Sequence, residues 1–360
     1  MDNHEQAFSW MFDSLRSLEK SGAMTSDINL IEGVGHRVVH GGHRFFESTV
    51  IDDEVLREIE RLNDLAPLHN PPSLAGMYGA RKFLGDSIPM VAVFDTMFHQ
   101  TIPRHAKTYA IPYKLAERHH IIRYGFHGIA HASLANSYAI HTGNSLNDQR
   151  LITMQLGNGC SITAIAYGKS TDTSMGFTPS EGLMMGTRSG DLDPSIISYL
   201  VRKEQVPVIG VQNWLDEHSG LLGISGETND MRRLLQAANH EQDERAQLAI
   251  DMFCYRIRKY LGAYLAVLGG SEAIVFGGGI GEGSPEIRAQ ICEGMEWCGL
   301  RLHKERNKTA VGLQPGTASE ISSDDSRIAA FVIGTDEKSW IASETARCLS
   351  TPRHKEERHE

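Results

Sequence analysis

The sequence predicts an α/β protein with two domains. Two observations support this prediction: segments of strand character alternate with segments of helical periodicity, and 360 residues exceed what one ordinary hydrophobic core encloses. A hydrophobic content of 41% and a charged content of 22% are typical of a folded globular chain. In this class of fold, ligands gather at loops beyond the strand ends, so charged and glycine-rich loops are the first candidates for a site.

The first third of the chain begins with a helix, because apolar residues between positions 8 and 18 recur at helical spacing. A turn at Gly41–Gly42 follows the first strand, and two prolines mark the entry to the third helix. The predicted elements are a helix over 3–21, a strand over 28–39, helices over 54–63 and 72–84, and a buried strand over 91–94 that ends at Asp95.

The remaining two thirds continue the alternation. Gly157-Asn158-Gly159 between two apolar segments predicts a tight turn joining two strands. The predicted elements are strands over 151–155 and 160–166, two helices between 194 and 217, a long helix over 239–268, a strand over 273–276, a helix from about 285, a strand over 328–333 and a helix over 335–348.

Composition excludes several classes of protein. No apolar segment reaches the roughly 18 residues of a membrane span, and the N-terminus has no signal-peptide pattern. The five cysteines form no CxxC pair, which favours reduced thiols in the cytoplasm over a disulfide framework or a zinc finger. A net charge of −10 argues against a nucleic-acid partner, although a small anionic substrate remains compatible with locally concentrated arginines.

Three glycine-containing loops are candidate anion sites. The segment Ser174–Pro194 surrounds Arg188 with Gly, Ser, Thr and Asp, and a guanidinium can bind two oxygens at once. The turn at 157–159 could cradle a phosphate, and Gly277–Gly281 lies between a buried strand and a helix. The alternatives are an ordinary surface loop, a plain hairpin turn and a flexible connection. Neither a P-loop nor the Rossmann GxGxxG pattern is satisfied.

Several charged residues and histidines occupy notable positions. Arg37 lies at the apolar end of a predicted strand and needs an anionic partner there. His127 precedes a predicted loop-to-helix junction and is either a satisfied polar residue or a functional one. Asp95 and Glu337 are candidates for helix-terminal carboxylates or for contacts to a hydrated cation. The histidines between 36 and 43 lack the additional ligands of a metal cluster.

Considered together, nine blocks resemble the acetate kinase family in the family's order and at similar spacing. The blocks are Gly35–Gly42, Leu65–Pro71, Val93–Pro103, Tyr124–His131, Leu156–Ser161, Asp172–Pro194, Ser219–Arg232, Gly279–Glu282 and Thr335–Glu337. The resemblance implies two RNase H-like domains of the actin-like ATPase type flanking a nucleotide cleft. We expect an N-terminal domain of residues 1–94 and 337–360, and a nucleotide-binding domain of 95–336. The resemblance also implies reversible phosphorylation of acetate by ATP, with Mg²⁺ or Mn²⁺. It further implies a cytoplasmic homodimer without nucleic-acid or membrane partners.

The resemblance also assigns roles to individual residues. Asp95, His127 and Arg188 correspond to catalytic residues, and Glu337 to a metal-binding carboxylate. The substrate-binding residues by resemblance are Arg37, Val39, Leu68, His69, Phe126 and Pro179. The nucleotide-binding residues by resemblance are Gly157, Asn158, Gly159, Asp230, Met231, Arg232, Gly279 and Gly281. The chemistry is compatible with these roles, because acetate is ionised at neutral pH and attacks phosphorus without a general base.

The chain departs from the family at its start. Family members open with two strands and a phosphate-facing loop, and here the sequence starts on the helix that follows. We therefore expect the N-terminal domain to be incomplete, with unpaired edges around the strand at 28–39. Two alternatives to an active acetate kinase follow: a remnant that binds nucleotide without catalysis, and a propionate kinase, since one methylene changes binding by only about 1–3 kcal/mol.

Overall fold

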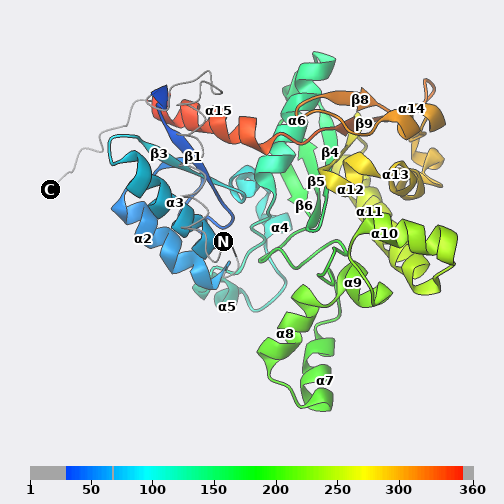
Figure 1. Cartoon of the computed structure of the whole chain (residues 1–360), viewed down its shortest axis with the longest axis horizontal. Coiled ribbons are helices and arrows are strands. Elements are labelled where there is room, and N and C mark those ends of the chain that lie inside the picture. Colours follow the sequence, from blue (N-terminus) through cyan, green and yellow to red (C-terminus); the bar gives the residue numbers. More distant parts are fainter. Residues whose placement is uncertain (1–29, 67–68, 352–360) are drawn as a thin grey trace, which may run out of the picture. The chain divides into compact units, whose positions relative to one another are not determined.

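The computed structural model describes residues 30–66 and 69–351 (Figure 1). The helix predicted over 3–21 lies outside the described residues. The chain divides into two compact units: unit 1 comprises Met1–Met97 with Glu337–Glu360, and unit 2 comprises Phe98–Asp336. The first segment of unit 1 extends three residues beyond the predicted boundary at Phe94 and includes Asp95. Each unit is described separately below.

Unit 1 is built around a three-stranded sheet of order β1-β3-β2. Its strands are β1 (Val34–Val38), β2 (Thr49–Val50) and β3 (Met90–Phe94). Strand β1 is parallel to β3, and β2 is antiparallel to it. The predicted strand over 28–39 is therefore shorter, and among the described residues β1 forms one edge of the sheet.

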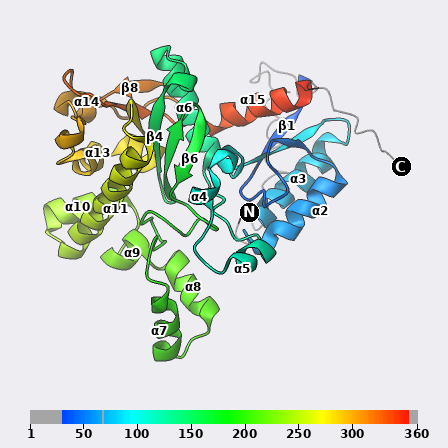
Figure 2. The same ribbon diagram turned by 180° about the vertical axis from the view of Figure 1, so that it is seen from behind.

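Helices cover both faces of this sheet (Figures 1 and 2). They are α2 (Asp53–Arg61) and α3 (Asn70–Leu84) on one face and α15 (Glu337–Ser350) on the other. Glycine in β1 allows α15 to approach closely, because a Cβ at Gly35 would lie 2.5 Å from Cγ2 of Ile341. On the opposite face Val38, Ile59, Met77 and Phe94 form a buried core.

Unit 2 contains a six-stranded sheet of order β6-β5-β4-β7-β9-β8. Its strands are β4 (Arg150–Leu156), β5 (Cys160–Ala166), β6 (Lys169–Thr173), β7 (Ala273–Gly277), β8 (Ala318–Glu320) and β9 (Ala329–Ile333). Strands β4, β7 and β9 are parallel, whereas β5, β6 and β8 pair antiparallel with their neighbours. The short strands β6 and β8 were not predicted, because each is largely polar.

The sheet of unit 2 is covered on one face by α6 (Gly128–Thr142) and on the other by α11 (Glu244–Leu268) (Figures 1 and 2). Alternation along the strands explains both layers. Leu151 of β4 packs with Leu134 of α6, while the intervening residues of β4 face the opposite layer. Both faces are buried, so strands β4, β5, β7 and β9 are apolar along most of their length.

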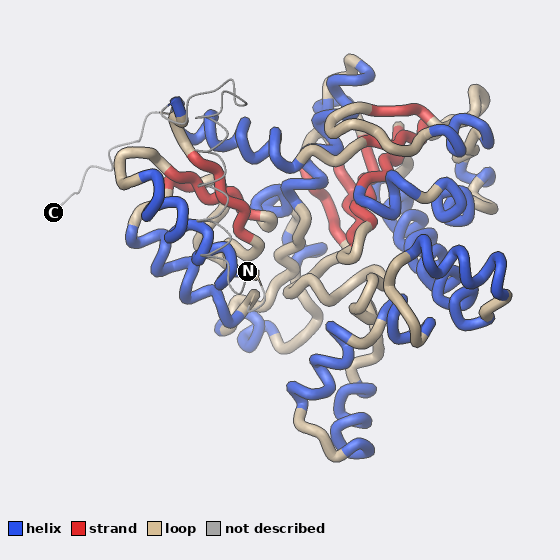
Figure 3. Tube along the Cα trace, viewed as in Figure 1, coloured by secondary structure: helices blue, strands red, loops and turns tan. Residues whose placement is uncertain are grey.

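The remaining helices of unit 2 lie in its loops. They are α4 (Arg104–Lys107), α5 (Tyr113–Arg118), α7 (Ser195–Glu204), α8 (Val208–Glu217), α9 (Gly220–Ser225), α10 (Met231–Gln236), α12 (Gly278–Gly283), α13 (Pro285–Cys292) and α14 (Lys304–Thr309). Helices α7 and α8 form a pair that extends away from the rest of unit 2 (Figure 3). Among the described residues, no helix combines the length and the hydropathy that crossing a membrane would require.

The long helix begins at Glu244 rather than at position 239. The carboxylate of Asp243 accepts hydrogen bonds from the backbone N–H groups of Arg245 and Ala246, which caps α11 at its N-terminus. A π-helical turn at Ala237–Glu241 precedes this cap. The apolar periodicity continues across this turn. The predicted helix therefore started five residues before the observed one.

Candidate functional site

In unit 2, His127 and Arg188 converge on the turn between β4 and β5. A Cβ added at Gly159 would lie 3.4 Å from Nε2 of His127 and 3.5 Å from Nη1 of Arg188. The glycine therefore allows an imidazole nitrogen and a guanidinium group to approach the same stretch of backbone. Residues from a turn, a helix N-terminus and a glycine-rich loop meet at this point, which is a candidate site for a small anion.

His127 is held by its backbone and by its ring. It occupies the N-cap position of α6 with φ 55° and ψ 24°, in the left-handed region that side-chain-bearing residues seldom adopt. Its Nδ1 lies 2.9 Å from Oγ of Ser161 on β5. The same hydroxyl lies 2.7 Å from Nε2 of the fully buried His131, one turn further along α6. The contact with Ser161 thus fixes the His127 ring on the side that faces the protein interior.

Arg188 lies in the loop Ser174–Pro194, as the glycine content predicted. Its Nη1 donates to the carbonyl of Pro179 at 3.3 Å and to the sulfur of Met185. Burial lowers the pKa of Arg188, and the negative charge of Asp216 opposes that shift. Because these two acceptors are uncharged, much of the guanidinium's charge is available to an anionic ligand.

A second set of contacts fixes the same loop. Arg123 donates to the carbonyls of Thr173, Ser174 and Met175 and pairs with Glu181 at 2.5 Å. Tyr109 hydrogen-bonds to Glu181 as well, and its hydroxyl accepts from the backbone N–H of Phe177 at 2.8 Å. These bonds hold the loop on either side of Pro179, which is one of the residues that the resemblance assigns to substrate binding.

A cavity of about 530 Å³ opens beside the turn at 157–159. Its lining residues are Gly157, Asn158, Asn229, Asp230, Met231, Arg232, Gly279, Ile280, Gly283 and Ser284. Six of the eight residues that resemblance assigns to nucleotide binding line this cavity. Gly159 and Gly281 do not: the first faces His127, and the second is buried against β4.

The loop between β7 and α12 carries Gly279 into this cavity. Oε1 of Glu282 accepts from the backbone N–H groups of Gly278 and Thr335 at 2.9 and 3.0 Å, and from the Thr335 hydroxyl at 2.8 Å. Gly278 has φ 74°, a conformation that favours glycine. The carboxylate therefore anchors both the glycine loop and the chain segment that leads to Glu337.

Arg288 of α13 secures the far end of α12. Its side chain is fully buried, and its five donor hydrogens meet five acceptors: the carbonyls of Gly281, Glu282, Asn307 and Ala310 and the side-chain oxygen of Asn307. Burial lowers its pKa to about 10, which still leaves the group charged at neutral pH. The carbonyls come from the C-terminal ends of two helices, where the partial charge is negative.

In unit 1, Arg37 forms a bidentate ion pair with Asp95. Nε donates to Oδ1 at 3.1 Å and Nη2 donates to Oδ2 at 2.7 Å. Asp95 is almost completely buried, whereas 39% of the Arg37 side chain is exposed. Glu337, the first residue of α15, lies 3.9 Å from Nη1 of the same arginine. The anionic partner that the sequence required for Arg37 is thus supplied by the end of the neighbouring strand.

The charges of this group influence one another. The Asp95 carboxylate raises the pKa of Arg37. Burial raises the pKa of Glu337, and the negative charge of Asp95 adds to that shift while Arg37 opposes it. Two carboxylates therefore share one guanidinium, and the negative charge is in excess.

Two further candidates of unit 1, Val39 and His69, lie at the ends of elements. Val39 is buried immediately after β1, and His69 is the N-cap residue of α3. Asn70 joins the two segments: its side chain accepts from the N–H of His40 and donates to the carbonyl of His40, both at 3.2 Å. Leu68 lies outside the described residues. In unit 2, Phe126 is buried and its carbonyl contacts Nε2 of His99 at 2.9 Å.

No group of three or more His, Cys, Asp or Glu in the described part of the chain could hold a metal ion alone. The excess negative charge at Asp95 and Glu337 nevertheless fits a hydrated divalent cation, which takes one or two carboxylates and completes its shell with water and substrate phosphates. This donor set is unsuited to zinc, because it lacks nitrogen and sulfur ligands.

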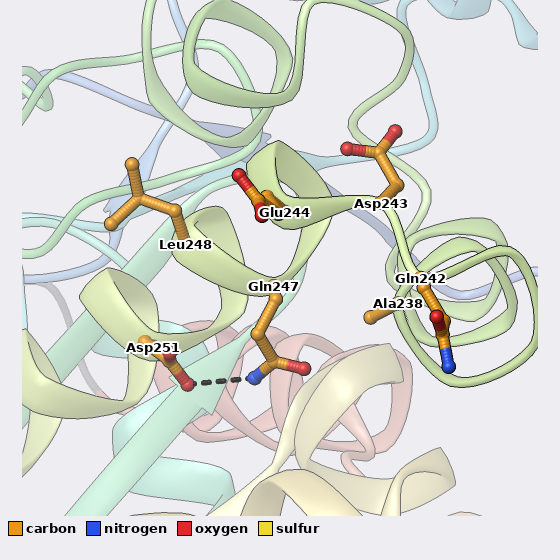
Figure 4. A pocket seen from close by; sticks show the side chains of 7 residues that line it. All are labelled: Ala238, Gln242, Asp243, Glu244, Gln247, Leu248 and Asp251. Carbon is orange, nitrogen blue, oxygen red and sulfur yellow. Dashed lines mark hydrogen bonds between the residues drawn. The ribbon is translucent and has the colours of Figure 1, made fainter.

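A second cavity lies at the start of α11 and is unlike the first (Figure 4). Its lining includes the carboxylates of Asp243, Glu244 and Asp251, and Gln247 donates to Asp251 at 2.8 Å. None of the seven side chains drawn in Figure 4 is basic. This cavity therefore does not suit a phosphate.

Four positioning residues escaped sequence reasoning: Ser161, Glu282, Arg288 and Asn70. Each acts through a contact between elements distant in the sequence, and no local pattern distinguishes such a residue from an ordinary polar one. The nearest signal for Ser161, Glu282 and Asn70 was their location inside the blocks that resemble the family, whereas Arg288 lies outside those blocks.

Comparison with known proteins identifies the family. Residues 1–343 match the acetokinase family. An acetate kinase from Solibacter usitatus is 50% identical, with 96% of this chain and 83% of that protein covered. One from Acetivibrio thermocellus is 46% identical, with 96% and 85% covered.

Solved structures agree with these matches. The acetate kinase of Porphyromonas gingivalis is 40% identical with a TM-score of 0.89, covering 97% of this chain and 86% of that one. A propionate kinase from Francisella tularensis is 39% identical with a TM-score of 0.85, covering 94% and 84%. These likenesses confirm the expected fold class, an α/β protein of actin-like ATPase architecture. The chain belongs to the acetokinase family.

Proposed function

We propose that this protein catalyses reversible phosphoryl transfer from ATP to acetate, giving acetyl phosphate and ADP. The observation that supports this activity best is the convergence of His127 and Arg188 over Gly159, beside a cavity large enough for a nucleotide. Family membership supports the same reaction, since relatives that cover most of the chain are named acetate kinase.

The reaction requires positioning and charge stabilisation more than proton transfer. The acetate oxygen is ionised at neutral pH and attacks the γ-phosphorus in line, so no general base is needed. Negative charge on the transferring group is spread over its oxygens and is stabilised by donors that are fixed in advance. In this proposal Arg188 and the Nε2 side of His127 supply those donors, and Arg37 binds acetate.

Asp95 orients Arg37 in this proposal and does not act as a base. Its bidentate bond fixes the plane of the guanidinium, and the exposed part of Arg37 remains able to bind an anion. The resemblance assigns Val39, Leu68, Phe126 and Pro179 to the methyl group of acetate, and their apolar side chains suit a short acyl chain. His69 is proposed as a further substrate-binding residue.

The nucleotide would occupy the cavity of unit 2. Asn158 and Gly279 would face its phosphates, while Asp230, Met231 and Arg232 would lie near the adenosine. Gly279 is exposed and a Cβ there would meet no atom within 4 Å, so the backbone is open to a ligand.

We propose Mg²⁺ as the metal, with Mn²⁺ as a substitute. Glu337 would hold it, with Asp95 contributing through water. When bound, the cation supplies positive charge to the nucleotide phosphates. The residues of unit 1 then act by holding two carboxyl groups beside a single arginine.

The enzyme is proposed to be a cytoplasmic homodimer. Apolar side chains exposed on the α7–α8 pair support self-association: Ile196, Tyr199, Val208, Ile209 and Trp214. All five cysteines are free, which is compatible with a reducing compartment. Light scattering coupled to size-exclusion chromatography measures the mass, and about 80 kDa is expected, twice the 39.8 kDa chain.

Trapping acetyl phosphate as its hydroxamate tests the activity. The purified chain receives ATP, Mg²⁺ and either acetate or propionate, and Arg188→Ala is compared with Arg301→Ala, which removes an exposed arginine paired with Asp325. We expect Arg188→Ala to lower kcat by at least about a hundredfold and Arg301→Ala to leave it unchanged.

Other outcomes would favour the alternatives. Absence of acyl phosphate together with retained ATP binding would identify a nucleotide-binding protein without kinase activity. A higher kcat/KM for propionate would make it a propionate kinase, as the relative from Francisella tularensis is named.

A further inference from the structure

Ser161 lies between two histidines and can determine which nitrogen of the site histidine carries hydrogen. Its Oγ is 2.9 Å from Nδ1 of His127 and 2.7 Å from Nε2 of His131. The chain continues inward, because Nδ1 of His131 lies 2.8 Å from Oγ1 of Thr153 on β4. Ser161, His131 and Thr153 are all fully buried, so no bulk water competes for these bonds.

The number of hydrogens restricts this chain to two directions. A hydroxyl donates one hydrogen and can accept two. If both histidines donated to Ser161, its own buried hydrogen would have no acceptor, because its side-chain contacts are these two rings. Ser161 therefore donates to one histidine and accepts from the other. His131 is neutral, since burial lowers its pKa well below the usual range, and it therefore has a single ring hydrogen. Either every bond points outward toward His127, or every bond points inward toward Thr153.

The charge on the other side of His127 selects between these directions. Its Nε2 approaches the same point as Nη1 of Arg188, where an anionic phosphoryl group is proposed to bind. An anion requires a donor, so Nε2 must carry hydrogen when the ligand is present. The positive charge of Arg188 also disfavours a second positive charge on the ring. A neutral His127 with hydrogen on Nε2 needs a donor to Nδ1, and Ser161 can supply it.

We propose that Ser161 is a positioning residue that donates to Nδ1 of His127 and thereby presents the Nε2–H to the transferring phosphoryl group. His131 and Thr153 complete the outward-pointing chain by donating to Ser161 and to His131. This inference rests on the proposed function for the identity of the anion, while the state of the ring can be measured independently of turnover.

The first experiment observes the ring nitrogens directly. The full chain labelled with ¹⁵N-histidine is studied by NMR at about pH 8.5, roughly two units above the ordinary histidine pKa, with acetyl phosphate as the ligand. The spectrum of His127→Asn assigns the signals of His127. We expect a protonated Nε2 and an unprotonated, hydrogen-bonded Nδ1. A protonated Nδ1, with or without a protonated Nε2, would overturn the proposal.

The second experiment compares two buried hydroxyls of the same strand. Ser161→Ala removes the contact to His127, whereas Thr163→Val removes a hydroxyl two residues further along β5 that contacts Thr173 at 2.8 Å instead of a histidine. Both side chains are fully buried. Thr163→Val therefore controls for the loss of a buried hydroxyl on the same face of the sheet.

We expect Ser161→Ala to lower kcat by about 10- to 50-fold, to change each KM by less than about threefold, and to alter the Nδ1 signal of His127. Thr163→Val should leave the His127 signals and kcat within about twofold of the unchanged protein. Equal effects of the two substitutions would refute a role for Ser161 beyond packing. If the unchanged protein forms no acetyl phosphate, the NMR result still decides the ring state, so the two failures are distinguishable.

Discussion

Replacing Arg288 with lysine should destabilise unit 2 severely, although the charge is conserved. The guanidinium satisfies five buried acceptors with five hydrogens, and the ammonium of lysine has only three. At least two acceptors then lose their partner in a site that water does not reach. Each buried unsatisfied group costs about 1–3 kcal/mol, so the expected loss in the free energy of unfolding is about 2–6 kcal/mol, centred near 4.

Urea unfolding measures this loss. With a slope of about 3 kcal/mol per molar urea, a loss of about 4 kcal/mol lowers the midpoint by about 1.3 M. Arg306→Lys is the matched control: its side chain is 41% exposed, it donates to the carbonyl of Ser322 and to Asp324, and water can replace both bonds. The control should lose less than about 1 kcal/mol. The reasoning is refuted if the two variants unfold at the same midpoint.

Three further predictions address the site and unit 1. Gly159→Ala should lower kcat about 10- to 100-fold in the hydroxamate assay with little loss of stability, because the new Cβ would lie 3.3 Å from Cε1 of His127. Gly262→Ala is the control and should stay fully active, because a Cβ there meets no atom within 4 Å. Burial lowers the pKa of His36 to about 4, so below pH 6.5 only the unfolded chain binds a proton there, and stability falls as the pH drops from about 6.5 to about 4. His36→Gln should flatten this part of the urea-midpoint profile, and an unchanged slope would contradict the assignment. Chelation of divalent cations should abolish acyl phosphate formation reversibly. The urea midpoint should stay constant, because Asp95 keeps its partner Arg37. Activity that persists in chelator would exclude the metal proposal.

The sequence predicts the bounds of an element correctly where its residue pattern begins and ends at the same positions as its hydrogen bonding. Strand β5 was predicted with its observed bounds, because its apolar residues lie between a glycine turn and a second turn. The predicted start of α11 was wrong because the cap at Asp243 interrupts a pattern that continues on both sides. Strand β6 was missed because its sequence, Lys-Ser-Thr-Asp-Thr, has no apolar alternation and is fixed by pairing with β5.

The candidate site could be predicted where residue type alone defines the chemistry. An arginine at the end of a strand required an anion, and the parallel pairing of β1 with β3 places Asp95 beside it. The contacts of Ser161 could not be predicted, since they depend on the juxtaposition of β5 with the first turn of α6. A serine in a strand has no property that distinguishes a partner of histidine from a partner of the backbone.

The left-handed backbone at His127 has a consequence for how its chemistry can be measured. Replacement by alanine would remove the ring and would also strain the main chain, so it would combine two losses in one measurement. Asparagine tolerates the left-handed region and has no imidazole. His127→Asn therefore isolates the contribution of the ring from that of the turn. At this position, an experimenter can treat the backbone and the side chain as separate variables.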